Sequence, residues 1–288
     1  MTAPFTLASP AEQTAPLVLS SPHSGRHYPA DFLRASQLDD RQIRSSEDAW
    51  IDDLWGGGPG MGVPLLAAVM PRAFIDLNRS PDELDPAVIE DVRHVAHNPR
   101  ISSGLGVIPR VVAGGRAITS GKMPRTEAEA RIERWWRPYH ACLSGLMEET
   151  ATRFGAAVLI DCHSMPREAM EGHPAARGQR PDVVLGDRFG TTADRGFVDR
   201  LEAILRAEGL SVLRNTPFAG AYIAQTYGNP SRRRHAVQIE IDRGLYMDER
   251  TLRRHDGYRA MRAMIGRITL SLMEAARDLA RPAELAAE

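Results

Sequence analysis

Residues 156–166 read AAVLIDCHSMP, and this stretch decides the expected fold. Its first five residues are small or branched and apolar, which is typical of a strand buried on both faces of a parallel sheet. Such a strand delivers Asp161, His163 and Ser164 to its carboxyl end. Ligands bind at that end in open α/β sheets, so we expect the functional site to begin here.

A second stretch near the N-terminus has the same pattern. Residues 17–25 read LVLSSPHSG, an apolar run that breaks at a proline and is followed by His23. Neutral imidazole is the commonest protein ligand of zinc, and two strands that each end at a histidine therefore predict one metal site. For His23 or His163 taken alone, a hydrogen-bonded structural role is the alternative.

The rest of the chain alternates short apolar runs with amphipathic segments. Further strands are expected at 63–69, 73–77, 181–185, 210–214 and 235–241, helical pieces within 30–55, and helices at 124–153, 192–208 and 248–281. Strands that alternate with helices predict a mostly parallel sheet covered by helices on both faces.

Three stretches show little periodicity. Residues 1–15 are polar and contain prolines, so we expect them to be loosely ordered, and residues 80–123 and 215–234 are expected to be irregular. No repeat or linker divides the chain, which therefore predicts a single domain over residues 1–288.

Composition narrows the class of partner. The 288 residues carry 36 basic and 37 acidic side chains, so no overall charge favours nucleic acid or an anionic membrane. We therefore expect a small-molecule partner. With only two cysteines, no signal-peptide pattern and no long apolar run, a cytoplasmic protein with reduced thiols is expected.

Two acidic residues are candidates for a third metal ligand. A catalytic zinc usually takes three protein ligands and leaves one position for water. Glu47 and Asp48 are adjacent at an expected helix start. The alternative is that they complement the dipole of that helix.

Glu240 is an isolated carboxylate in the expected strand 235–241. An unpaired acidic residue would be costly to bury there, so it either faces a polar site or has a partner. In a metal-dependent hydrolase, this setting suits a general base near a water molecule. The alternative is a salt bridge to Arg232, Arg233, Arg234 or Arg243.

Asn78 and Arg79 follow the expected strand 73–77. The Arg79 guanidinium offers a fork of donors that can bind a carboxylate through two hydrogen bonds, and Asn78 could orient a carbonyl or carboxylate beside it. The alternative is a turn that carries a surface arginine. Trp135 and Trp136 are expected in a helix core, and His140 has no ligand spacing.

Together these pieces resemble the N-formylglutamate amidohydrolase family. The resemblance covers roughly residues 15–250 and rests on SPHSG at 21–25, IDLNR at 75–79, GLGVIPR at 104–110, PYH at 138–140, IDCHS at 160–164 and QIEI at 238–241. The family is similar in fold to zinc carboxypeptidases and to the aspartoacylase group. The resemblance implies one α/β domain with a mixed, mostly parallel sheet and one zinc ion.

The resemblance also implies roles for individual residues. His23 and His163 look like the histidine ligands of the zinc. Carboxypeptidases place a glutamate ligand three residues after the first histidine, but that position is Arg26, which cannot bind a metal. The resemblance therefore favours Asp48 as the third ligand, with Glu47 as the fallback.

The implied substrate-binding and catalytic residues are Asn78 and Arg79, which resemble the pair that holds a substrate carboxylate, and Glu240, which resembles the general base. The implied reaction is hydrolysis of N-formyl-L-glutamate to formate and glutamate, usually as part of histidine breakdown. A second arginine would suit the second carboxylate, and the sequence does not rank Arg110, Arg116, Arg125 and Arg243.

Two other functions stay open at this stage. One is a zinc deacylase or carboxypeptidase-like hydrolase that acts on another N-acyl amino acid or a short peptide. The other is a metal-free binding or regulatory protein that keeps the scaffold, against which the presence of His23, His163, Arg79 and Glu240 argues. The sequence does not indicate an oligomeric state.

Overall fold

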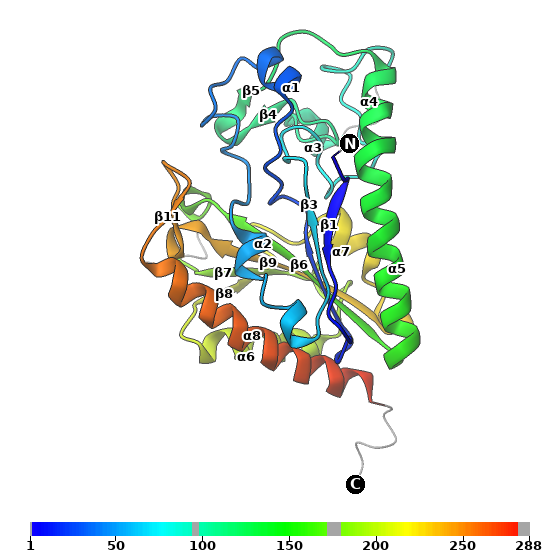
Figure 1. Cartoon of the computed structure of the whole chain (residues 1–288), viewed down its shortest axis with the longest axis vertical. Helices are drawn as coiled ribbons and strands as arrows, with labels where there is room; N and C mark the ends of the chain where they lie inside the picture. The colour runs from blue at the N-terminus through cyan, green and yellow to red at the C-terminus, as the bar shows by residue number, and fades with distance from the viewer. Residues whose placement is uncertain (1, 94–97, 172–179, 282–288) are drawn as a thin grey trace. The chain divides into compact units, whose positions relative to one another are not determined.

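Seven strands form one sheet in the order β1-β3-β2-β6-β9-β7-β8 in the computed structural model, which describes residues 2–93, 98–171 and 180–281 (Figure 1). The strands are β1 (Phe5–Ala8), β2 (Leu17–Ser21), β3 (Leu65–Ala68), β6 (Ala157–Met165), β7 (Val183–Gly186), β8 (Val212–Arg214) and β9 (Arg234–Asp242). β6 runs parallel to β2 and β9, β7 runs parallel to β8, and β7 runs antiparallel to β9. The fold is therefore α/β with a mixed, mostly parallel sheet.

β6 is the central strand, as the sequence predicts. All nine of its residues are buried. This burial explains the continuous apolar run that begins the strand, because a strand covered on both faces cannot alternate apolar with polar side chains. The polar residues of β6 are confined to its carboxyl end, where the chain has its candidate ligands.

Helices flank the sheet. α6 (Arg195–Ala207) and α8 (Gly257–Ala280) pack against each other, and α8 also packs against β2 and β6 (Figure 1). α6 begins at an Asp194 cap whose side chain accepts the Phe197 N–H, and its apolar face is buried. α7 (Tyr222–Tyr227) packs against β6 and β9.

One long helical stretch precedes β6. It consists of α4 (Arg125–Arg131), the π-helical turn η3 (Ile132–Trp136) and α5 (Arg137–Phe154), in agreement with the helix expected at 124–153. The remaining elements are α1 (Ala30–Ala35), α2 (Ile51–Leu54), η1 (Pro59–Met61), α3 (Pro99–Ser102), β4 (Val111–Val112), η2 (Ala113–Gly115), β5 (Arg116–Ala117), η4 (Arg167–Met170), η6 (Pro230–Arg232), η7 (Arg243–Leu245), β10 (Met247–Asp248) and β11 (Arg253–Arg254).

The chain forms two compact units. The first contains residues 1–6, 22–49 and 67–142, and the second contains residues 7–21, 50–66 and 143–288. The second unit holds β2, β6, β7, β8 and β9, and the first holds the largely irregular segments 36–49 and 71–93. That residues 1–288 act as one domain stays a prediction.

Several local expectations differ from the structure. The stretch 215–234, expected to be irregular, contains the short helix α7. In the stretch expected to be loosely ordered, residues Phe5–Ala8 form β1, because strand pairing at a sheet edge uses backbone groups and does not need buried side chains. The expected strand 73–77 is a buried irregular segment, in which the Asp76 N–H bonds to the carbonyl oxygen of Val107 rather than to a strand. The expected helix 248–281 begins only at Gly257.

The late start of that helix has a local cause. The Asp248 carboxylate accepts the backbone N–H groups of Arg250 and Thr251 at 2.7 and 3.3 Å. This Asx turn joins β10 to β11 as a short hairpin and competes with helical hydrogen bonding. A similar effect limits the helical content of 30–55 to α1 and α2, since the Asp39 carboxylate accepts the N–H groups of Arg41 and Gln42.

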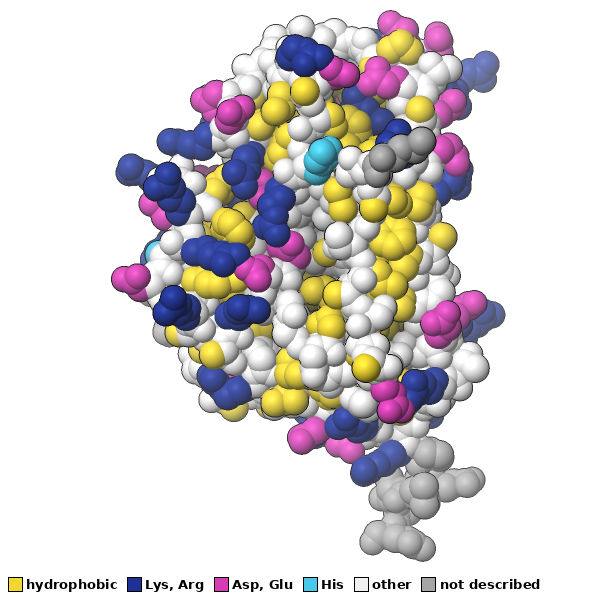
Figure 2. Space-filling model, in the orientation of Figure 1, with side chains coloured by type: hydrophobic (Ala, Val, Ile, Leu, Met, Phe, Trp, Pro, Cys, Tyr) yellow, Lys and Arg dark blue, Asp and Glu magenta, His cyan; other side chains and the backbone are white. Residues whose placement is uncertain are grey.

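The surface agrees with the balanced composition. On the face drawn in Figure 2, basic and acidic side chains are interspersed. Among the described helices, none combines the length and the apolar composition that a bilayer-spanning segment needs.

Candidate metal centre

β6 carries Asp161 and His163 on the same face, because side chains two residues apart in a strand point the same way. Both are buried, and His163 Nε2 lies 3.0 Å from Asp161 Oδ2. A carboxylate only accepts hydrogen bonds, so Nε2 carries the proton and Nδ1 presents its lone pair. The local strand geometry alone therefore gives His163 the tautomer that a metal ligand needs.

β9 brings Glu240 beside this pair. The parallel register of β6 and β9 places His163 opposite Glu240, so their side chains leave the same face of the sheet on adjacent strands. Gln238, two residues earlier, donates from Nε2 to Glu240 Oε1 at 2.7 Å, and its own Oε1 accepts the Ala221 N–H. Glu240 is thus a buried carboxylate that is oriented by a neutral amide.

Three of the four arginines that are alternative partners of Glu240 contact other groups. Arg233 donates to carbonyl oxygens at Gly155 and at the end of α8, Arg234 pairs with Glu148, and Arg243 donates to Ser164 Oγ at 3.1 Å.

His23 follows β2 by two residues and is 2% exposed. Its Nε2 lies 2.7 Å from Asp76 Oδ1, and its Nδ1 lies 3.5 Å from Asp48 Oδ2. The Asp76 carboxylate therefore accepts a hydrogen bond from Nε2–H, and the lone pair of Nδ1 points towards Asp48. The backbone of Asp48 is held to the same residue, since its N–H donates to the His23 carbonyl oxygen at 3.0 Å.

Glu47 and Asp48 have different surroundings, although they are adjacent in the sequence. The Glu47 carboxylate accepts from Arg44 Nε and Nη2 at 2.9 and 3.1 Å and from the Tyr28 hydroxyl at 3.1 Å. Burial and the Glu47 charge raise the pKa of Tyr28, so this hydroxyl stays a donor. The Glu47 carboxylate is therefore paired with Arg44 and Tyr28, whereas the Asp48 carboxylate faces His23.

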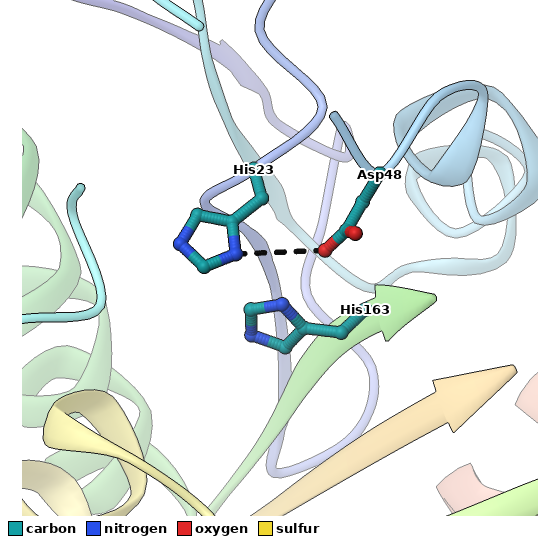
Figure 3. A group of neighbouring side chains, drawn as sticks. All are labelled: His23, Asp48 and His163. Atoms are coloured by element: carbon teal, nitrogen blue, oxygen red, sulfur yellow. Dashed lines mark ion pairs between the residues drawn. The ribbon is translucent and has the colours of Figure 1, made fainter. Parts of the chain in front are cut away.

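Three ligand atoms converge, one each from His23, Asp48 and His163. These atoms all lie within 4.8 Å of one another, and all three residues are buried (Figure 3). Two imidazoles and one carboxylate form the kind of donor set that binds a catalytic zinc, with a position left for a small molecule. Each imidazole also has an aspartate beside its Nε2, which is the usual arrangement behind a histidine that binds a metal ion through its other nitrogen.

Asn78 and Arg79 lie on the irregular segment that also supplies Asp76. Asp76 Oδ1 accepts the Asn78 N–H at 2.8 Å. The Arg79 side chain is nearly buried, and it donates from Nε to the Leu105 carbonyl oxygen at 2.9 Å and from Nη1 to the Asn78 carbonyl oxygen at 3.0 Å. Burial lowers the pKa of Arg79, although its ordinary value is so high that it remains a cation. The alternative of an exposed surface arginine is therefore wrong.

The four arginines left unranked by the sequence differ in their surroundings. Arg116 donates to the Ala113 carbonyl oxygen and Arg125 pairs with Glu129, and both of these arginines are exposed. Arg110 Nε lies 3.1 Å from Asp85 Oδ2. Arg243 is buried beside Ser164.

Asp76 and Asp161 are the residues whose roles the sequence reasoning missed. Each lies two positions before a residue that was singled out, Asn78 and His163, inside a motif that was quoted for the family resemblance. For Asp161, the spacing in a strand could have indicated the contact with His163. For Asp76, no local signal points to His23, which lies 53 positions away.

Comparison with known proteins gives one consistent result. The family model for N-formylglutamate amidohydrolase matches residues 15–247. N-formylglutamate deformylase of Pseudomonas aeruginosa is 31% identical over 270 residues, which cover 91% of this chain and 94% of the relative. The enzyme of the same name from Pseudomonas putida is 30% identical over 237 residues, which cover 81% of this chain and 82% of the relative.

A solved structure agrees with these sequence matches. The crystal structure of N-formylglutamate amidohydrolase from Ralstonia eutropha JMP134 superposes with a TM-score of 0.88 at 39% identity, covering 96% of this chain and 99% of that one. The family match spans most of the chain, including the segments that carry His23, Asp48, Asn78, Arg79, His163 and Glu240. The chain belongs to the N-formylglutamate amidohydrolase family.

Proposed function

We propose that this protein is a zinc-dependent hydrolase that cleaves N-formyl-L-glutamate to formate and L-glutamate. The observation that carries the proposal is the buried group of His23, Asp48 and His163, with an aspartate oriented on each histidine. The names of the relatives support the substrate, since both curated relatives are N-formylglutamate deformylases.

His23, Asp48 and His163 would hold the zinc. A zinc ion in such a site lowers the pKa of a water ligand and polarises a carbonyl group, which is the chemistry that amide hydrolysis needs. The contribution of the chain is to fix the tautomer of each neutral ring: Asp76 and Asp161 accept hydrogen bonds from Nε2–H, which leaves the lone pair of each Nδ1 for a metal ion.

Glu240 would act as the general base. It would take a proton from the attacking water and return it to the nitrogen of the departing amine, so that the carboxylate is regenerated in each cycle. The hydrogen bond from Gln238 fixes one oxygen of Glu240, which leaves the position of the other oxygen well defined for this transfer.

Arg79 and Asn78 would bind a substrate carboxylate. The guanidinium has five N–H donors, and the contacts with the Leu105 and Asn78 carbonyl oxygens use two of them. These contacts fix the plane of the guanidinium before substrate arrives, which reduces the entropy lost on binding.

The test is formate release from N-formyl-L-glutamate by the zinc-loaded protein, compared with chelated protein and with His163→Ala and Glu240→Gln. Chelation and His163→Ala should remove both zinc and activity. Glu240→Gln should keep stoichiometric zinc but lower kcat by about 10²- to 10⁴-fold, because only the proton transfer is lost. The matched control is Glu148→Gln, the same substitution at an exposed residue of α5, which should leave kcat unchanged.

The outcomes separate the metal site from the substrate. If zinc binds stoichiometrically and formate never appears, the acyl group is a different one, and a panel of other N-acyl amino acids becomes the next assay. If the protein neither binds zinc nor loses activity in His163→Ala, the metal-dependent mechanism is wrong.

A further inference from the structure

The segment from Phe74 to Arg79 is buried without belonging to a helix or a strand. Buried backbone carbonyl groups need hydrogen-bond donors, and a segment outside regular structure must obtain them from elsewhere. In this protein three carbonyl groups of the segment receive hydrogen bonds from side chains of the helical stretch that runs from α4 through η3 into α5.

Three side chains of that helical stretch each reach one carbonyl oxygen. Arg131 Nη1 donates to Phe74 at 3.3 Å, His140 Nε2 donates to Leu77 at 2.8 Å, and Trp136 Nε1 donates to Arg79 at 2.9 Å. The carbonyls of Leu77 and Arg79 lie on either side of Asn78. The two residues that would bind substrate are therefore held from both sides by one helix.

Trp136 and His140 form a rigid pair. They are four residues apart on the helix, their ring centroids are 3.9 Å apart with an interplanar angle of 30°, and each residue is 6% exposed. Burial lowers the pKa of His140 to about 4, so its ring is neutral near pH 7 and its Nε2 proton serves the Leu77 carbonyl. Trp136 closes the π-helical turn η3, a feature that is frequent at functional sites.

We propose that Trp136 and His140 are positioning residues for substrate binding, which act by holding the backbone of Asn78 and Arg79 in the orientation that receives a substrate carboxylate. The inference rests on the proposed function of Asn78 and Arg79. Trp136 and His140 need not touch the substrate, since their effect passes through the two carbonyl groups.

The first test is Trp136→Phe, which removes the indole N–H and keeps an aromatic ring beside His140. We expect KM for N-formyl-L-glutamate to rise about tenfold while kcat stays within about twofold, because a lost carboxylate-binding geometry weakens ground-state and transition-state binding alike. Zinc should stay stoichiometric.

The chain offers a matched control in Trp135→Phe. Trp135 has the same burial as Trp136, but its ring nitrogen donates no hydrogen bond within the described residues, and the Arg134 guanidinium lies over its ring. This variant should keep KM within about twofold of the wild type, since it removes no donor from the segment.

The second test uses two substitutions of His140. Glutamine can place an amide N–H near the position of Nε2, whereas leucine fills the space without a donor. We expect His140→Gln to keep most of the wild-type KM and His140→Leu to raise KM about tenfold. A merely structural role for the ring would not distinguish donor from non-donor by KM alone.

Amide hydrogen exchange over residues 74–80 gives a readout that does not depend on activity. Exchange should be faster in Trp136→Phe and in His140→Leu than in Trp135→Phe. If exchange rises while KM stays unchanged, or if neither changes, the positioning role is wrong. If the wild type binds zinc but releases no formate, the proposed substrate is wrong. The positioning role is then tested separately, by the exchange data and by KM for the N-acyl amino acid that the protein does cleave.

Discussion

The two histidines of the candidate metal centre are oriented by the same chemistry in two different settings. His163 receives its aspartate from two positions earlier on the same strand, whereas His23 receives Asp76 from 53 positions away in an irregular segment. The first contact is a consequence of strand geometry, and the second exists only after the chain has folded. The same contact between a histidine Nε2 and an aspartate can thus arise from local or from long-range structure.

The surroundings of the two histidines differ in the same way. In β6 and β9, backbone groups bond to backbone groups, and the register alone places His163 opposite Glu240. In the segment from Phe74 to Arg79, side chains replace the strand partners, with Asp76 accepting from Asn78 and His140 and Trp136 donating to carbonyl oxygens. Replacing a side chain should therefore remove hydrogen bonds that hold the segment from Phe74 to Arg79. In β6 and β9 the bonds that set the register join backbone groups.

The strongest contrast should come from Glu47 and Asp48, which are adjacent but have different partners. Asp48→Asn should weaken zinc binding by more than about 100-fold, because it removes a charged ligand, while Glu47→Gln should leave zinc affinity within about threefold. Glu47→Gln should instead lower the free energy of unfolding, since Arg44 and Tyr28 lose a charged partner. Zinc competition titrations on both variants measure this, and equal losses of affinity would contradict the assignment of Asp48.

A smaller effect is expected when each orienting aspartate is changed in turn. Asp76→Asn and Asp161→Asn should each reduce zinc affinity by about 10- to 100-fold. Asp76→Asn should also raise KM, because Asp76 Oδ1 accepts the Asn78 N–H and Asp76 Oδ2 lies 3.0 Å from Arg72 Nε. Asp161→Asn should leave KM unchanged. Steady-state kinetics at saturating zinc separates the two, and a KM change of the same size in both variants would remove the distinction between the regions.

The smallest effect concerns stability against acid. Burial lowers the pKa of His140 to about 4, below the ordinary histidine value, so the unfolded chain binds a proton more readily than the folded one. The stability from the neutral ring is complete above about pH 6.5 and declines as the pH falls towards 4, by about 2 kcal/mol at pH 5. His140→Gln should lose less stability between pH 7 and pH 5 than the wild type does. Urea unfolding at both pH values measures this, and parallel losses in the two proteins would show that His140 titrates normally.

Much of the fold could be predicted from local patterns. The continuous apolar run before Asp161 predicts a doubly buried strand, and β6 is that strand. The helices α5 and α6 and the strands β2, β7, β8 and β9 also lie close to their expected positions. One buried face gives a helix its periodic pattern, and burial of both faces gives a strand a continuous apolar run. The strand expected at 73–77 is wrong, because a buried irregular segment can have the same apolar composition as a buried strand.

The sequence by itself determined the strand that carries Asp161 and His163, the position of His23 just after a second strand, and the acidic pair from which a third ligand could come. Only the tertiary structure placed Asp48, and not Glu47, in the group with His23 and His163, gave His23 its partner Asp76, and showed that Trp136 and His140 donate to the backbone on either side of Asn78. The physical reason is the range of the interactions. Strand and helix periodicity act over a few residues and leave a record in the sequence, whereas a side chain that satisfies a distant buried carbonyl or imidazole leaves no local pattern.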